Sequence, residues 1–211
     1  MRYPLRAVLA LSLACTVSAC AAAEEADHAE GMDTPVAALE LTDLESTVET
    51  LHEKFTALAG AMPADDLGWR PMEGVRSVEE VFIHIAADNW FVPALMGWEA
   101  PAETGVTSDG ATFQAYQQRT MTRDEMLDAV DDSFRFLRES MTESRGDLGR
   151  EVTLGTPTTV GDVWIRAVVH LHEHLGQSIA YARSNGVVPP WSRWRARRPA
   201  RTPREEHEGH G

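Results

Sequence analysis

Three histidines are spaced so that they could bind one metal ion. His170 and His174 lie four residues apart in a segment predicted to be helical. Their side chains therefore share one face, with Cβ atoms roughly 5–6 Å apart. Two imidazoles on one helix face suit a divalent metal. His84 belongs to a second predicted helix and shares a face with apolar residues, so we expect it to point inward. The sequence thus predicts a divalent-metal site where these helices meet.

Such a site could support chemistry at the metal. Three neutral imidazoles leave a coordination position open, as in catalytic rather than structural sites. The metal could polarise a substrate oxygen or thiol, or lower the pKa of bound water. Asp88, one turn after His84, and Gln177, three residues after His174, are candidates to support the ligands. The sequence identifies no catalytic residue, and zinc, nickel, manganese and iron all suit three histidines to differing degrees.

A competing pattern covers the same residues. Positions 170–174 fit H-x-x-E-H, the inverted zincin signature, in which Glu173 would be the general base of a protease. That scheme needs a further acidic ligand on a later helix, but the only later acids lie in the C-terminal tail, so we consider it weaker. The remaining histidines lack partners at ligand spacing and are expected to stay outside the site: His28, His52, His172, His207 and His210.

Four amphipathic segments are expected to position these residues. Apolar residues recur at helical spacing, with capping boxes at Ser77/Glu80 and Thr122/Glu125. Pro93 is predicted to end the second helix, and residues 93–114, rich in Gly, Pro and Thr, are predicted to form a long crossover loop that could include one short helical turn. Residues 152–154 could be extended, but no sheet or internal repeat is evident. The pattern predicts an all-α four-helix bundle, with helices over residues 40–60, 77–91, 122–144 and 159–185.

The N-terminus carries a secretory pattern. Arg2 and Arg6 precede a short apolar run, and Val-Ser-Ala then leads to Cys20, which resembles a bacterial lipobox. We therefore expect residues 1–19 to be a signal peptide and Cys20 to carry a lipid. Ala21 after the cysteine suggests sorting to the outer membrane. The alternative is an ordinary signal peptide cleaved close to the same position.

Composition constrains the remaining organisation. Residues 20–38 are predicted to be a flexible tether, residues 39–190 one domain and residues 191–211 a disordered tail. The formal net charge of −14 at pH 7 disfavours nucleic-acid binding. The chain has two cysteines, and Cys15 would be removed with the signal peptide. Lipidation of Cys20 would then leave no free thiol for a disulfide, a nucleophile or a metal site. We expect a lipid-anchored envelope protein that faces the periplasm.

Three sequence blocks resemble the DinB superfamily of DinB/YfiT-like metalloenzymes. They are residues 67–71 with 76–85, residues 170–177 (H-x-x-x-H-x-G-Q) and residues 179–190, which end in Pro-Pro. The resemblance implies a four-helix bundle that binds a divalent metal through His84, His170 and His174. Leu175 departs from the arginine common in the family. Some relatives are thiol transferases or thiol-dependent isomerases, and many are cytoplasmic, unlike the location expected here.

The residues and the resemblance together suggest a metal-dependent hydrolase or transferase acting on a small molecule of unknown identity. The alternative is a non-catalytic lipoprotein that binds metal or another ligand. A homodimer is compatible with either function, because dimers are common among such bundles.

Overall fold

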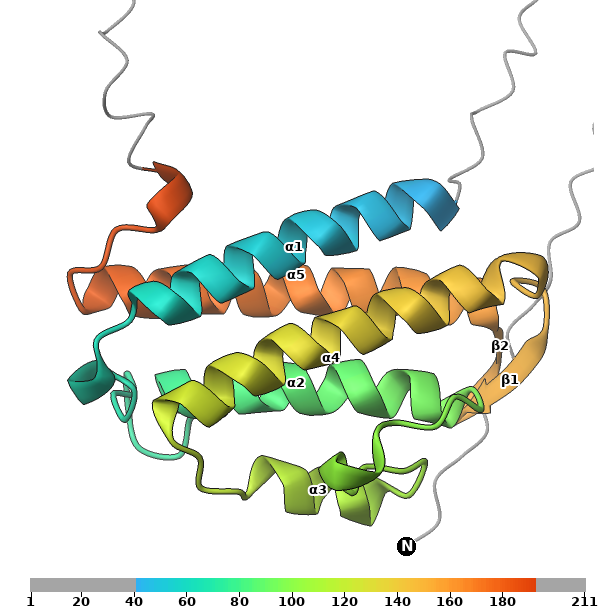
Figure 1. Cartoon of the computed structure of the whole chain (residues 1–211), viewed down its shortest axis with the longest axis horizontal. Helices are drawn as coiled ribbons and strands as arrows, with labels where there is room; N and C mark the ends of the chain where they lie inside the picture. The colour runs from blue at the N-terminus through green and yellow to red at the C-terminus, as the bar shows by residue number, and fades with distance from the viewer. Residues whose placement is uncertain (1–40, 193–211) are drawn as a thin grey trace, which may run out of the picture. The chain divides into compact units, whose positions relative to one another are not determined.

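The computed structural model describes residues 41–192. Four long helices in this part are α1 (Leu41–Ala61), α2 (Val78–Leu95), α4 (Arg123–Glu143) and α5 (Val160–Ser184). Both α1 and α2 contact α4 and α5, so the four helices close into a bundle (Figure 1). Short 3-10 turns lie at Ala64–Asp66, Ala102–Thr104, Ser144–Gly146 and Pro190–Ser192. The predicted all-α bundle is confirmed.

The helices begin where the capping residues predict. The Ser77 side chain accepts a hydrogen bond from the Glu80 backbone N–H, and the Glu80 carboxylate accepts one from Ser77 N at 2.7 Å. Thr122 and Glu125 form the same reciprocal pair at the start of α4. Thr159 caps α5 by accepting from Asp162 N. Each cap satisfies backbone donors that the first helical turn leaves unpaired.

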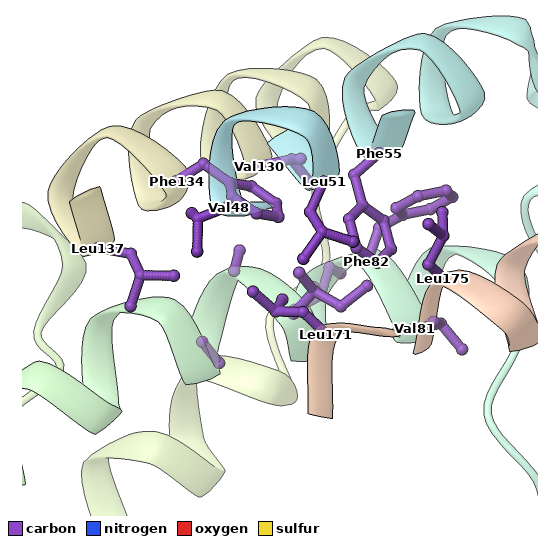
Figure 2. Packing of buried hydrophobic residues seen from close by; sticks show 14 of the residues in the cluster. Val48, Leu51, Phe55, Val81, Phe82, Val130, Phe134, Leu137, Leu171 and Leu175 are labelled. Atoms are coloured by element: carbon purple, nitrogen blue, oxygen red, sulfur yellow. The ribbon is translucent and has the colours of Figure 1, made fainter. Parts of the chain in front are cut away.

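Apolar side chains from all four helices fill the interior of the bundle (Figure 2). Phe55 of α1 lies at its centre, with its ring 6.5 Å from that of Phe82 and 5.6 Å from that of Phe134. Leu175 also packs into this core, which explains why a leucine is acceptable where the family resemblance would favour arginine. This packing holds α2 against α5 and fixes the relative position of the histidines.

The segment after α2 contains more regular structure than the sequence predicted. The helix continues through Pro93 to Leu95, so the expected end before Pro93 is wrong. A proline inside a helix removes one i→i−4 hydrogen bond and crowds the carbonyl four residues earlier, but α2 ends two residues after Pro93, so the cost is confined to its last turn. A helix, α3 (Gly110–Gln117), begins inside the predicted crossover loop and extends beyond its end at residue 114; it is capped by Asp109, packs against α2 and is longer than the single turn that the loop could have included.

A small hairpin is a second departure from the prediction. β1 (Glu151–Leu154) pairs antiparallel with β2 (Thr156–Thr159), and Glu151 lies opposite Thr159. Gly155 forms the turn with φ +75°, a conformation that glycine adopts without strain. The sequence indicated only an extended stretch at residues 152–154, because Thr-Pro-Thr-Thr of the second strand shows no alternation of apolar and polar residues.

His52 has a partner that the sequence did not predict. Its Nε2 lies 2.8 Å from Asp131 Oδ1, and its ring stacks on Phe134 with centroids 5.0 Å apart. Its partner lies on α4, far away in the sequence, where no local pattern could reveal it. The pair links α1 to α4 and lies outside the metal-ligand group.

Several predictions lie outside the described residues: the signal peptide, Cys20, the tether, and the tail beyond Ser192. Trp191, placed in the predicted tail, packs against the core, so packing continues just past the predicted boundary at Pro190. Within residues 41–192, no helix combines the length and the apolar character needed to cross a bilayer.

Candidate metal centre

The structure brings His84, His170 and His174 together. His84 projects from the middle of α2 and the other two project from α5, which packs against α2. The ring centroids are 5.4 Å apart for His84–His170, 4.7 Å for His84–His174 and 4.4 Å for His170–His174. One ring nitrogen from each histidine lies within 4.8 Å of the other two. The three side chains could therefore form a metal site.

Gln117 fixes which nitrogen of His84 faces the centre. Its Oε1 lies 2.8 Å from His84 Nδ1 and also accepts a hydrogen bond from Arg76 Nη2 at 3.1 Å. A guanidinium only donates, so the amide atom between the two must be the oxygen rather than the nitrogen. His84 Nδ1 therefore donates to Gln117, and Nε2 keeps its lone pair for a metal.

Gln177 plays the equivalent part for His174. Its Oε1 lies 2.8 Å from His174 Nδ1, and its Nε2 donates to the Tyr181 hydroxyl at 3.0 Å. Tyr181 in turn packs edge-on against Trp69, with ring centroids 5.3 Å apart. An amide held in this orientation leaves the Nδ1 proton on His174 and makes Nε2 available.

Asp88 lies among the ligands themselves. One turn after His84, its Oδ2 lies 3.0 Å from His84 Nε2 and accepts a hydrogen bond from His170 Nε2 at 2.8 Å. Its side chain is 14 % exposed. The carboxylate thus contacts ligands from both helices.

The protonation states suit metal binding. Burial lowers the pKa of His84 to about 4, against the opposing influence of the Asp88 carboxylate. Burial also lowers the pKa of His174, whereas the hydrogen bond to Asp88 raises the pKa of His170. Metals bind the neutral imidazole. Two ligands are therefore held in the required neutral form, whereas the raised pKa of His170 means that protons compete more strongly with a metal at that ligand.

These atoms together fit a divalent cation. With its proton on Nδ1, His84 directs the lone pair of Nε2 towards a carboxylate oxygen 3.0 Å away. Two electron-rich atoms at this separation repel one another unless a positive charge lies between or beside them. A metal held by the histidines would supply that charge, and imidazole nitrogens are its usual ligands.

The centre is open on the α5 side. The His170 side chain is 39 % exposed, compared with 9 % for His84. Phe113 of α3 lies next to His84, with ring centroids 6.1 Å apart, and it stacks on Phe91. A small molecule could thus approach the metal along an apolar wall.

Sequence reasoning missed the contribution of α3. Gln117 and Phe113 both lie in the segment whose helix was not predicted, and Arg76 was noted only as part of a motif. The Asp109 cap was the local signal that could have revealed this helix. Glu173, the general base of the inverted zincin alternative, is exposed, as is His172.

Two solved structures have similar folds. A DinB-like protein of Bacillus subtilis (YjoA) is 20 % identical, with a TM-score of 0.52 over 68 % of this chain and 92 % of that one. A DinB-like protein of Bacillus cereus is 12 % identical, with a TM-score of 0.56 over 71 % of this chain and 95 % of that one. No curated protein matches the chain.

Family membership rests on a sequence profile. The DinB superfamily profile matches residues 47–178, which is more than half of the chain. The match spans α2 and most of α5, and so includes all three histidines. The chain belongs to the DinB superfamily.

Proposed function

We propose that this protein is a divalent-metal-dependent hydrolase or transferase that acts on a small molecule. The observation that carries the proposal is the convergence of His84, His170 and His174, with amide oxygens already bonded to Nδ1 of two of them. These hydrogen bonds orient the imidazole rings for metal binding in the absence of metal. When bound, the metal would act as a Lewis acid towards a substrate oxygen or sulfur or towards water.

The uneven exposure of the three ligands favours catalysis over a purely structural role. A structural metal is usually closed off by four protein ligands, whereas a catalytic metal keeps a position for substrate. Here the His170 side of the centre reaches solvent. Phe113 and Phe91 would contact the apolar part of a substrate, and the Gln117 and Gln177 amides would keep the imidazoles in place.

A chelation experiment tests this function. The purified protein, with its metal content measured, is assayed with panels of small esters, amides and electrophiles with thiol donors. We expect turnover that EDTA abolishes and that added Zn²⁺, Ni²⁺, Mn²⁺ or Fe²⁺ restores. His170→Ala should lose turnover while its circular dichroism spectrum remains that of the wild type. Metal bound without any turnover would favour the non-catalytic alternative.

We further propose that the enzyme is anchored to the envelope by a lipid on Cys20 and faces the periplasm. Ala21, which follows the cysteine, favours the outer membrane. The support is the lipobox-like sequence before that residue. Expression in a bacterial host with labelled palmitate tests this. The wild type should incorporate label and partition into detergent, whereas Cys20→Ser should do neither. Equal partitioning of the two proteins would contradict the anchor.

A further inference from the structure

Asp88 occupies an unusual position for a residue that merely supports metal ligands. Such residues normally contact the imidazole nitrogen that points away from the metal. Gln117 does this at Nδ1 of His84, and Gln177 does it at Nδ1 of His174. Asp88 Oδ2 instead lies against Nε2 of His84, the nitrogen left free for the metal.

The separations match those of ligands that share one ion. Two atoms each about 2.1 Å from a metal, at angles of 90–110°, are about 3.0–3.4 Å apart. Asp88 Oδ2 is 3.0 Å from His84 Nε2 and 2.8 Å from His170 Nε2. The first separation is at the lower end of that range and the second is just below it, at hydrogen-bond length, so a shift of a few tenths of an ångström would place the carboxylate in a coordination sphere shared with ligands from two helices.

The carboxylate is also available for a metal. Within residues 41–192, its ion pairs are with His84 and His170 alone, and no arginine or lysine neutralises it. Its side chain is 14 % exposed, so water screens it only partly. The i,i+4 relation to His84 on α2 holds it in place without a loop movement.

We propose that Asp88 Oδ2 is a fourth protein ligand, so that the metal is bound by three imidazole nitrogens and one carboxylate oxygen, and that substrate or water takes a fifth position on the exposed His170 side. This inference rests on the proposed metal centre and adds to it the donor set. A carboxylate reduces the net charge of a bound divalent ion, and its oxygen is a hard donor that soft metal ions bind poorly. The set therefore favours zinc, manganese or iron over soft Cu(I).

The test uses the full chain and Co²⁺ as a spectroscopic probe. Dissociation constants are measured by chelator competition for the wild type and for Asp88→Asn, which keeps the shape of the side chain but removes its charge. Glu173→Gln is the matched control. Glu173 also acts on His170 through its charge but is exposed on α5. Gln117→Leu serves as the comparison for the loss of a supporting hydrogen bond, which should weaken metal affinity by about 10–100-fold.

Asp88→Asn should weaken Co²⁺ binding by more than Gln117→Leu does, on the order of 100-fold or more. It should also change the visible Co²⁺ spectrum, while Glu173→Gln alters affinity less than about 3-fold. Asp88→Asn binding within about 3-fold of the wild type with an unchanged spectrum would overturn the inference. Equal losses in Asp88→Asn and Glu173→Gln would do so too, because they would indicate only a distant charge effect.

A measurement on the wild type keeps the inference testable if Asp88→Asn does not fold. X-ray absorption and a crystal structure of the Zn²⁺-loaded protein should place Asp88 Oδ2 about 2.0–2.2 Å from the ion. A separation beyond about 3 Å would overturn the fourth ligand while leaving the three-histidine centre intact. A wild-type protein that binds no divalent metal would refute both this inference and the proposed function.

Discussion

Arg76 donates a hydrogen bond to Oε1 of Gln117 at 3.1 Å, and this contact determines how the Gln117 amide presents itself to the metal centre. The same oxygen receives the Nδ1 proton of His84 at 2.8 Å. An exposed arginine that precedes α2 thus orients, through a side chain of α3, a buried histidine in the middle of α2. The centre depends on three segments rather than on the histidine motif alone.

The contact between Gln117 and His84 predicts a loss of metal affinity in Gln117→Leu. Leucine cannot accept the Nδ1 proton, so His84 can adopt the other tautomer and lose its Nε2 lone pair. We expect Zn²⁺ to bind about 10–100-fold more weakly, as measured by competition with a chromogenic chelator. Gln118→Leu, at the exposed neighbouring position, is the control. Equal affinities for Gln117→Leu and the wild type would show that the contact does not orient the ligand.

The histidine spacing was the part of the site that the sequence revealed. His170 and His174 are only four residues apart, so helical periodicity alone places them together, and the inward face of the second helix indicated His84. Gln117 could not be found in this way, because α3 is short and its partner lies 33 residues earlier. The distance between Asp88 and His170 likewise depends on how α2 packs against α5, which no local pattern specifies.

In the fold as well, features set by neighbouring residues were predicted, whereas contacts between residues far apart in the sequence were not. The capping boxes at Ser77 and Thr122 marked the helix starts, because each is complete within four residues. Pro93 misled the prediction, since a proline usually ends a helix, whereas α2 continues for two residues beyond it. The pairing of His52 with Asp131 spans 79 residues and becomes visible only once α1 and α4 are packed.

Metal binding should stabilise the folded chain. A ligand that binds only the native state at 100 times its dissociation constant adds about 2.7 kcal/mol, which raises Tm by roughly 5–10 °C for a domain of this size. We expect this increase when Zn²⁺ is added to the metal-free wild type in differential scanning fluorimetry. His84→Ala should show little increase under the same conditions. An equal increase in both proteins would place the stabilising ion elsewhere.

Glu80 should contribute stability that depends on pH. The hydrogen bond from the Ser77 backbone N–H, with help from Arg70, holds its pKa below the usual value despite the opposing effect of burial. A lowered folded-state pKa means that the contribution is present above the unfolded-state pKa of about 4.3 and is lost as pH falls through the folded-state value.

Glu80→Ala should accordingly lower the free energy of unfolding by about 1 kcal/mol at pH 7. The difference from the wild type should narrow as the pH falls below about 4. Urea denaturation at several pH values measures both effects, with Glu79→Ala as the control at the adjacent position. A difference between wild type and Glu80→Ala that stays constant down to pH 3 would contradict the role of the carboxylate.

The core around Phe55 should tolerate truncation poorly. The ring is fully buried and contacts Phe82 and Phe134. Phe55→Ala should reduce the free energy of unfolding by about 3–5 kcal/mol, because it removes apolar contacts and leaves a cavity. Urea denaturation measures the loss, and Val188→Ala, at an exposed site, should change stability by less than about 0.5 kcal/mol. A loss below 1 kcal/mol in Phe55→Ala would indicate a looser core than the structure shows.

The number of metal ions bound per chain tests the central claim most directly. Equilibrium dialysis against Zn²⁺, followed by elemental analysis, compares the wild type with His84→Ala, His170→Ala and His174→Ala, and with His172→Ala as the matched control. We predict one ion per chain for the wild type and His172→Ala, and loss of that ion in each of the other three variants. A wild type without metal, or an ion retained in all three of these variants, would contradict the account.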